Sequence, residues 1–575
     1  MLKYLKKYWF FCVAAALFMV GEVSMDLYQP DLMADIVDNG VLKSDVDLIV
    51  SVGIRMILCV ILGGVCGIMC GVFANYAAQH FGNDVRKSLF EKIMSLSQEQ
   101  TDKFSTGSLV TRLTNDVTQV QNTVMMSVRG LVRNTVMFAG GIIMLYRQSP
   151  RFALIAACGL PFIILAVIFF LRRTSPLFAV VQRKLDGINN VMQEDVRGAR
   201  VVKAYVKESH ELERFDRANG ELCDVNLRVH TLLAFMGPCM NIVLNICIVT
   251  VILVGGFTFR TGGDMTPGRI MAAITYLAQI LHGVTFMANI FQTFTRARAS
   301  ADRINEVFRT ECVIVDGDGE KTPVPIGEVE FRGVSFSYAP STVRVLDNVS
   351  FRVKPGETFA IIGATGSGKS SLVNLIPRFF DCTEGEVLVD GVNVKDYKLT
   401  ELRERIAIVL QKAELYQRSI ESNIRWGRRD ADPFEIKTAA EIAQADDFIC
   451  ETEYGYFTPV TEGGHSLSGG QTQRISIARV VIKGSPIMIF DDSTSALDLH
   501  TEAELYRELG ERTERSTKII IAQRIASIKG ADRIAVLNNG RIEALGTHEE
   551  LLAASEIYRD IYNSQLKEGG DICDA

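Results

Sequence analysis

Residues 363–370, Gly-Ala-Thr-Gly-Ser-Gly-Lys-Ser, decide the fold of the region in which they lie. They follow the apolar run 358–362 and precede an apolar helical pattern, which is the context that a phosphate-binding loop requires. Glycines let the backbone wrap phosphates with its N–H groups pointing inward, and the helix N-terminus that follows adds partial positive charge. We expect Lys369 to reach the β- and γ-phosphates of a nucleotide and Ser370 to bind Mg²⁺. The residues predicted to hold the nucleotide here are Gly363, Thr365, Gly366, Ser367, Gly368, Lys369 and Ser370.

A second apolar run, 487–491 or Ile-Met-Ile-Phe-Asp, is typical of a buried strand that ends in a carboxylate. Asp491 is placed to hold Mg²⁺ through water and would complete the nucleotide site. Alone, an apolar strand ending in Asp is common, and a glycine-rich turn can form without a ligand. The two motifs together favour a nucleotide site over these simpler alternatives.

The segment 467–471, Leu-Ser-Gly-Gly-Gln, precedes Asp491 and resembles the signature motif of ABC ATPases. Further motifs of that family follow in order: Tyr338 resembles the aromatic residue that stacks on adenine, and Gln411 resembles the Q-loop glutamine. Residues 495–498, Ser-Ala-Leu-Asp, resemble the D-loop. The resemblance implies that ATP and Mg²⁺ are bound and that Gln411 helps to hold the metal. It also implies that a signature loop serves the ATP of a second subunit, and the residues concerned are Ser468, Gly469, Gly470 and Gln471.

Two positions depart from the family pattern. The metal-binding Asp is normally followed by the Glu that orients the attacking water, but here Asp492 follows, one methylene shorter. The switch His that normally follows the strand 519–522 is replaced by Gln523, which can donate a hydrogen bond but carries no charge. With the signature intact, this combination resembles the degenerate subunit of bacterial heterodimeric multidrug ABC exporters. A homodimer with two slow sites is the alternative.

The chain as a whole combines an apolar and a soluble part. It has 575 residues, of which 48% are hydrophobic and 22% charged, and a mean hydropathy of +0.17. A net charge of -6 argues against a nucleic-acid partner. The 12 cysteines are scattered without a CxxC pair, which favours small core residues over disulfides or a zinc site.

Six apolar stretches precede residue 300, and each approaches the length of a membrane helix. They lie at about 8–28, 48–82, 129–146, 152–171, 232–259 and 265–291. We expect an all-α, polytopic membrane domain with six transmembrane helices and long cytosolic extensions at 83–128 and 172–231. This part resembles the exporter-type ABC fold, with 111–117 and 198–208 resembling the segments around its coupling loops. An α/β P-loop ATPase domain should follow.

The predicted domains are a membrane domain at 1–309, a linker at 310–326, a nucleotide-binding domain at 327–566 and a polar, irregular tail at 567–575. Basic residues near the start and in both extensions predict a cytosolic N-terminus and nucleotide-binding domain. We expect a multi-pass protein of the cell membrane.

Charged residues also occur inside the first two spans. Glu22 and Asp26 lie four residues apart, on one helix face, and Arg55 enters the second span from the same side. A structural Glu22–Arg55 pair is the prediction, with a substrate-binding role as the alternative.

The function that these patterns favour is ATP-driven export of amphipathic small molecules, drugs or lipids, by one half of a heterodimer. The expected partners are a second half-transporter, the lipid bilayer and the transported compound. A lipid flippase, or an ATP-gated channel or channel regulator, is the alternative; no motif in the membrane part identifies the transported compound.

Overall fold

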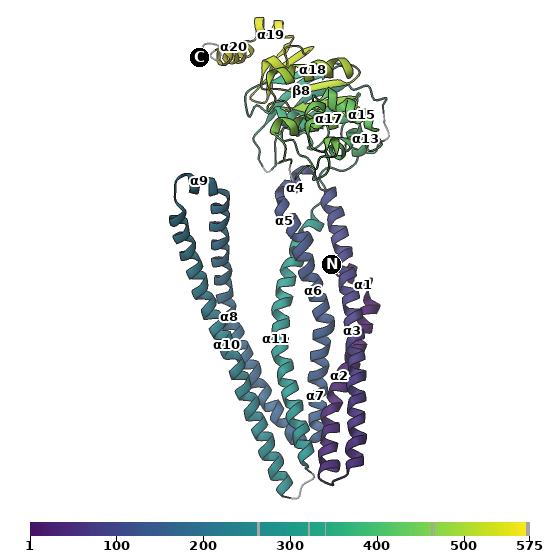
Figure 1. Cartoon of the computed structure of the whole chain (residues 1–575), viewed down its shortest axis with the longest axis vertical. Helices are drawn as coiled ribbons and strands as arrows, with labels where there is room; N and C mark the ends of the chain where they lie inside the picture. Colours follow the sequence, from purple (N-terminus) through teal and green to yellow (C-terminus); the bar gives the residue numbers. More distant parts are fainter. Residues whose placement is uncertain (262–264, 320–322, 340, 462–463, 465, 571–575) are drawn as a thin grey trace. The chain divides into compact units, whose positions relative to one another are not determined.

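The computed structural model describes residues 1–575 apart from 262–264, 320–322, 340, 462–463, 465 and 571–575. Side chains outside the description are those of 2, 281–282, 284–285, 287–292, 295 and 566–570. The chain forms two compact units, residues 1–94 with 105–310, and residues 95–104 with 311–575 (Figure 1). Each unit is described by itself.

The first unit is entirely helical within its described residues. Its elements are α1 (Leu2–Lys6), α2 (Trp9–Asp35), η1 (Ile36–Val41), α3 (Val46–Ser95), α5 (Thr106–Thr111), η2 (Arg112–Asp116), α6 (Val117–Met126), η3 (Ser127–Leu131), α7 (Val132–Gln148), α8 (Pro150–Arg197), α9 (Ala199–Ala204), α10 (Glu208–Arg260) and α11 (Pro267–Arg309). Both α8 and α11 begin with Pro after a capping residue, because Pro suits the first helical position and a hydroxyl side chain satisfies a free N–H. Helices α8 and α10 run side by side and α9 joins their ends (Figure 1).

Five helical segments of the described residues are long and apolar enough to cross a membrane. They are Trp9–Val41, Val46–Ser95, Thr106–Gln148, Pro150–Arg197 and Glu208–Arg260. The sixth predicted span, 265–291, lies within the 43 residues of α11 from Pro267 onward. With 50 residues, α3 is about 75 Å long, more than twice the hydrocarbon thickness of a bilayer. Long helical extensions of the spans are therefore present, as predicted.

The first span is longer than predicted. Helix α2 continues through Pro30 to Asp35, and the π-helix η1 extends it to Val41. The side chain of Asp38 holds this end in place, because it accepts hydrogen bonds from the backbone N–H of Gly268 at 2.8 Å and from the Thr266 hydroxyl. Asp31, Asp35 and Asp38, which lie beyond the predicted end of this span, are therefore helical.

The predicted Glu22–Arg55 pair is wrong. Arg133 of α7 binds Glu22 with one guanidinium nitrogen and Asp26 with the other, the latter at 2.9 Å. Arg55 is exposed. The sequence spacing located the two carboxylates on one face of α2 correctly, but their partner is Arg133, a residue far along the chain that packing brings beside them.

The second unit contains two sheets. Its strands are β1 (Val329–Phe336), β2 (Leu346–Val353), β3 (Thr358–Ile362), β4 (Glu384–Val389), β5 (Val392–Asn393), β6 (Ile406–Val409), β7 (Ile487–Asp491), β8 (Thr517–Ile521), β9 (Arg533–Asn538) and β10 (Arg541–Gly546). Its helices are α4 (Gln98–Phe104), α12 (Lys369–Leu375), α13 (Leu399–Glu404), α14 (Ile420–Arg425), α15 (Pro433–Ile442), α16 (Asp446–Glu451), η4 (Gly455–Phe457), α17 (Gly469–Lys483), α18 (Leu499–Arg512), η6 (Ile525–Ser527), α19 (His548–Ala554) and α20 (Glu556–Gly570).

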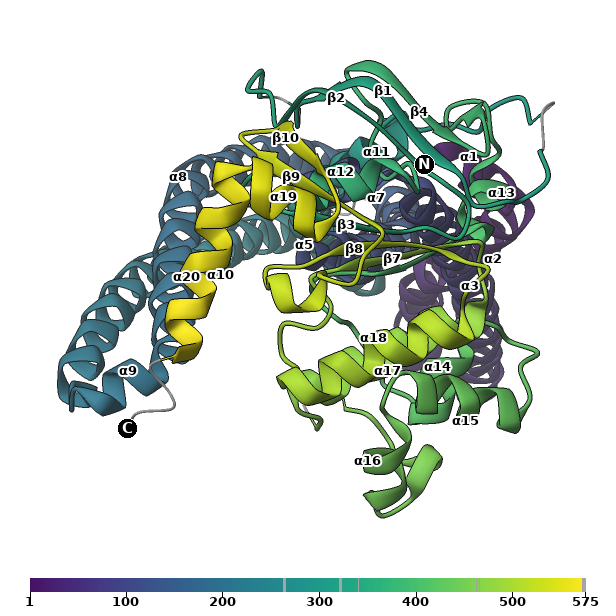
Figure 2. The same ribbon diagram turned by 90° about the horizontal axis from the view of Figure 1, so that it is seen from above.

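The larger sheet has the order β10-β9-β3-β8-β7-β6 and is parallel from β9 to β6. The smaller sheet, β2-β1-β4-β5, is antiparallel and lies on one side of the larger one, with α17 and α18 on the other (Figure 2). Along β7, Ile487 and Ile489 pack into the core between the sheets, whereas Met488 and Phe490 pack into the core beneath the helices. Strands buried on both faces explain the continuous apolar runs in the sequence.

The segments predicted as linker and tail are more ordered than expected. Within residues 311–319, the backbone N–H of Gly317 donates to the Tyr397 carbonyl at 2.9 Å, and the carbonyl of Val315 accepts from Arg378 at 2.9 Å. The start of the predicted linker is thus packed against the second unit. Helix α20 runs to Gly570, so residues 567–570 are helical in place of the irregular tail predicted.

Candidate nucleotide-binding site

Four parallel strands bring the predicted site residues to one edge of the larger sheet. Gly363 follows β3 and Gln411 follows β6, while Asp491 ends β7 and Gln523 follows β8. Because β6, β7, β8 and β3 are adjacent and parallel, their carboxyl ends meet at the same edge, where α/β folds bind ligands. The topology therefore gathers residues that are far apart in the sequence.

The loop after β3 has the geometry of a phosphate-binding loop. Gly368 has φ 101°, a left-handed conformation, and a Cβ there would approach the Val345 carbonyl oxygen to 2.9 Å. The Lys369 amine donates to the carbonyls of Gly363 and Ala364, at 2.8 and 2.9 Å. The Ser370 hydroxyl donates to the Asp491 carboxylate at 2.9 Å. The predicted lysine, serine and aspartate are thus brought together around one loop.

Several groups around this loop fit a nucleotide and its metal ion. The hydroxyl of Ser367 is buried and has no hydrogen-bond partner among the described residues. Burial lowers the pKa of the Lys369 amine and raises the pKa of the Asp491 carboxyl, which a neighbouring Asp492 raises further. A phosphate beside Lys369 and a cation beside Asp491 would offset these costs. The oxygen ligands of Ser370 and Asp491 are the kind that Mg²⁺ prefers.

Tyr338 lies at the side of the same loop. Its ring meets Phe336 and Phe380 edge-on, with centroids 4.7 and 5.1 Å away, and its hydroxyl is 2.9 Å from that of Ser371 on α12. The side chain remains 36% exposed. A fixed aromatic ring with exposed surface beside the phosphate loop suits stacking on a base.

The two departures from the family pattern contact each other. The amide of Gln523 donates to the Asp492 carboxylate at 2.7 Å. Asp492 adopts φ 49°, which is uncommon for a residue other than glycine and is found at functional sites. Burial raises the pKa of its carboxyl, while the amides of Gln523 and Gln411 oppose the shift. Gln411, predicted as a metal ligand, lies near this carboxylate.

Residue Gln565 of α20 was not predicted, yet it fixes the segment that carries Gln523. Its side-chain oxygen accepts from the Ile525 N–H at 2.9 Å, and its amide donates to the Gln523 carbonyl at 2.7 Å. A lone Gln near the end of a chain gives no sequence signal for this role.

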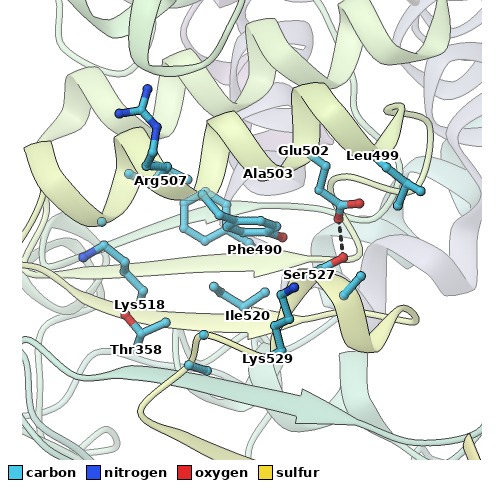
Figure 3. Close-up of a pocket in the computed structure, with 16 residues that line it drawn as sticks. Thr358, Phe490, Leu499, Glu502, Ala503, Arg507, Lys518, Ile520, Ser527 and Lys529 are labelled. Carbon is cyan, nitrogen blue, oxygen red and sulfur yellow. Dashed lines mark hydrogen bonds between the residues drawn. The ribbon is translucent and has the colours of Figure 1, made fainter. Parts of the chain in front are cut away.

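Glu502 is a second unpredicted contributor. It is 3% exposed and accepts hydrogen bonds from Thr494, which precedes the D-loop, and from Ser527 of η6, both at 2.5 Å. Figure 3 shows Glu502 and Ser527 facing each other at the edge of a cavity of about 550 Å³ between α18 and β8. The D-loop and the switch segment are therefore connected through one buried carboxylate.

The signature segment has a different environment. Ser468 caps α17, accepting from the Gln471 N–H at 3.3 Å, and the Gln471 side chain returns a bond from the Ser468 N–H at 2.9 Å. Gly470 packs closely on the D-loop, because a Cβ there would lie 2.9 Å from the Ala496 carbonyl oxygen. Ser468 and Gly469 are exposed, and within the described residues no hydrogen bond joins 468–471 to the phosphate loop. These groups are open to another molecule.

Comparison with known proteins agrees with this arrangement. Residues 11–284 match the ABC transporter transmembrane region, and residues 346–495 match the ABC transporter family. The chain is 39% identical over 577 residues to the uncharacterized ABC transporter ATP-binding protein YfiB of Bacillus subtilis, covering 100% of this chain and 99% of the relative. The chain belongs to the ABC transporter family. It is therefore a multi-pass, ATP-driven transporter with a membrane domain and an ATP-binding domain in one chain.

Other relatives extend the comparison. The chain is 33% identical over 539 residues to an ATP-dependent lipid A-core flippase of Syntrophus aciditrophicus, covering 93% of this chain and 89% of the relative. The solved structure of a bacterial Atm1-family ABC exporter with ATP bound superposes with a TM-score of 0.81 over 98% of both chains, at 23% identity. This ABC transporter therefore has the exporter fold.

Proposed function

We propose that the chain is the degenerate subunit of a heterodimeric ABC exporter for amphipathic small molecules or lipids. In this proposal its own ATP site hydrolyses slowly, and its signature loop completes the competent site of a partner half-transporter. The observation that supports the proposal is the hydrogen bond between Asp492 and Gln523, because it joins the two residues that depart from the family pattern.

Position, rather than basicity, is the proposed defect of Asp492. A general base works best with a pKa near the working pH, and burial already moves the pKa of Asp492 upward. However, its carboxylate accepts a hydrogen bond from the amide of Gln523, and its side chain is one methylene shorter than that of Glu. A base must lie within about 2.6–3.2 Å of the proton that it abstracts. Gln523 offers an amide instead of a cationic imidazole to the developing charge on the γ-phosphate.

ATP binding requires none of the altered groups. Lys369 would hold the β- and γ-phosphates, Ser370 and Asp491 would hold Mg²⁺, and Tyr338 would stack on adenine. When bound, Mg²⁺ neutralises charge on the phosphates. In this proposal the slow site binds ATP and helps to keep the two ATP-binding domains together, while the partner's site turns over.

The substrate class and orientation belong to the same proposal. The exporter fold and a relative named as a lipid A-core flippase support an amphipathic or lipid substrate moved out of the cell. The basic extensions support a protein of the cell membrane whose ATP-binding domain lies in the cytosol. A homodimer remains the second candidate because one chain contains both an intact phosphate loop and an intact signature, so two copies could form two composite sites.

The test is steady-state ATPase activity of the purified chain, alone and with a half-transporter that has Glu and His at the positions of Asp492 and Gln523. We expect little activity from the chain alone and robust activity from the pair. A preparation with Lys369→Ala and Asp491→Asn measures contaminating ATPase. Robust turnover by the chain alone would favour the homodimer.

A further inference from the structure

A polar cavity lies inside the membrane domain, where apolar side chains predominate. It has a volume of about 480 Å³ and is lined by α2, α3, η3 and α7, with Glu22, Asp26, Arg129 and Arg133 among its walls. Glu22 lies 13 residues before the end of α2, about 20 Å along the helix. Charged groups at such depth are costly unless they pair or serve a function.

The charges of this cavity are only partly satisfied. Arg133 bridges Glu22 and Asp26, so one cation serves two carboxylates. The second carboxylate oxygen of Glu22 is buried and has no hydrogen-bond partner among the described residues. Arg129 also lines the cavity, and within the described part of the chain no hydrogen bond or ion pair engages its guanidinium. One acceptor and one cation therefore remain available.

The local backbone creates the space for these groups. A Cβ at position 67 would lie 2.9 Å from the free oxygen of Glu22, so Gly67 permits the carboxylate to approach α3. At Gly64 a Cβ would meet nothing within 4 Å, so the helix surface there is open. Arg129 lies on η3, a π-helical turn, and such turns are frequent at functional sites.

We propose that this cavity binds the headgroup of an amphiphile that carries both an N–H ammonium and a phosphate, with the phosphate on Arg129 and the ammonium on Glu22. The apolar walls provided by Val60 and Ile68 suit the chain beside that headgroup. The inference rests on the proposed export of amphiphiles and specifies their headgroup. An aminophospholipid and a smaller phosphoamine compound share this chemistry.

The experiment measures binding without ATP turnover, so that failure of this site and failure of the proposed heterodimer are distinguishable. The purified full chain is titrated with lysophosphatidylethanolamine and analysed by native mass spectrometry. Lysophosphatidylcholine lacks the N–H donors, lysophosphatidic acid lacks the amine, and dodecylammonium lacks the phosphate. Competition by phosphoethanolamine or by inorganic phosphate distinguishes a lipid from a free headgroup as the preferred ligand.

We expect lysophosphatidylethanolamine to bind about tenfold more tightly than each of the three analogues, since each lacks a charge-assisted hydrogen bond. Arg129→Gln should remove the preference over the amphiphile that lacks a phosphate, whereas Arg147→Gln, an exposed change on α7, should retain it. Gly67→Ala should weaken binding, and Gly53→Ala, where a Cβ meets nothing within 4 Å, is the matched control for folding. Equal binding of all four amphiphiles, or an unchanged preference in Arg129→Gln, would overturn the proposal.

Discussion

The signature segment and the edge of the sheet around Asp492 belong to the same unit but use their polar groups differently. Ser468 and Gln471 hydrogen-bond each other at the start of α17, which leaves Ser468 and Gly469 exposed. At the sheet edge, the Asp492 carboxylate accepts a hydrogen bond from Gln523. Polar groups of the first region are exposed, whereas in the second region the side chains of Asp492 and Gln523 hydrogen-bond each other. This difference is what the proposed heterodimer requires, in which the chain serves the ATP of a partner and hydrolyses its own ATP slowly.

The largest predicted effect comes from blocking the signature segment. In the heterodimer, Ser468→Arg places a long side chain where the partner's γ-phosphate should lie, and ATPase activity should fall about 100-fold or more, as when essential transition-state contacts are lost. Lys369→Ala removes a phosphate contact only at the slow site and should reduce activity less than about fivefold. The measurement is steady-state ATPase of both variants beside wild type.

The matched control for this pair is Ser466→Arg, an exposed serine two residues before Ser468. It introduces the same side chain outside the predicted contact and should retain activity. If Lys369→Ala and Ser468→Arg cause equal losses, the assignment of a strong and a weak site is wrong.

The sequence predicts the ATP-binding fold well because its motifs are local. The phosphate loop requires glycines next to a strand and a helix, and the strand 487–491 is recognisable from its own residues. The meeting of Gly363, Asp491 and Gln523 follows once parallel pairing of β3, β8 and β7 is assumed. The closed Asp492–Gln523 pair does not follow, because it depends on side-chain conformations at the ends of two strands.

The sequence does not identify contacts between side chains that are far apart along the chain. Glu22 and Asp26 were placed on one face by helical periodicity, but periodicity within one helix cannot choose between Arg55 and Arg133 as their partner. The first span was also predicted too short, because Asp38 is stabilised by hydrogen bonds from Thr266 and Gly268, which lie much later in the sequence. Tertiary contacts of this kind override local polarity.

A smaller effect is expected from restoring the slow site. Ser468→Arg inactivates the competent site. In a heterodimer that carries this change, the remaining ATPase activity comes from the slow site, so an increase there can be measured. Asp492→Glu should raise ATPase activity about twofold, because the longer side chain can reach the attacking water. Asp492→Glu with Gln523→His should raise it about tenfold, because both residues act on one water and one γ-phosphate. The measurement is kcat of each single variant and the double variant. A double variant no faster than its parent would place the defect in the partner's signature loop.

The smallest predicted effect concerns Gln565, which hydrogen-bonds the backbone carbonyl of Gln523 and the backbone N–H of Ile525. In the restored double variant, Gln565→Leu removes both bonds and should lower kcat about threefold, because only part of their net free energy, about 0.5–1.5 kcal/mol each, affects the transition state. KM should stay unchanged, because the phosphate loop and Tyr338 are untouched. Gln565→Glu keeps the acceptor for Ile525 but loses the donor to Gln523, so its kcat should be intermediate. Asn563→Leu, an exposed change on the same helix, controls for damage to α20. A merely structural role would lower stability in both leucine variants without a graded kcat, and that outcome would remove Gln565 from the account of the switch segment.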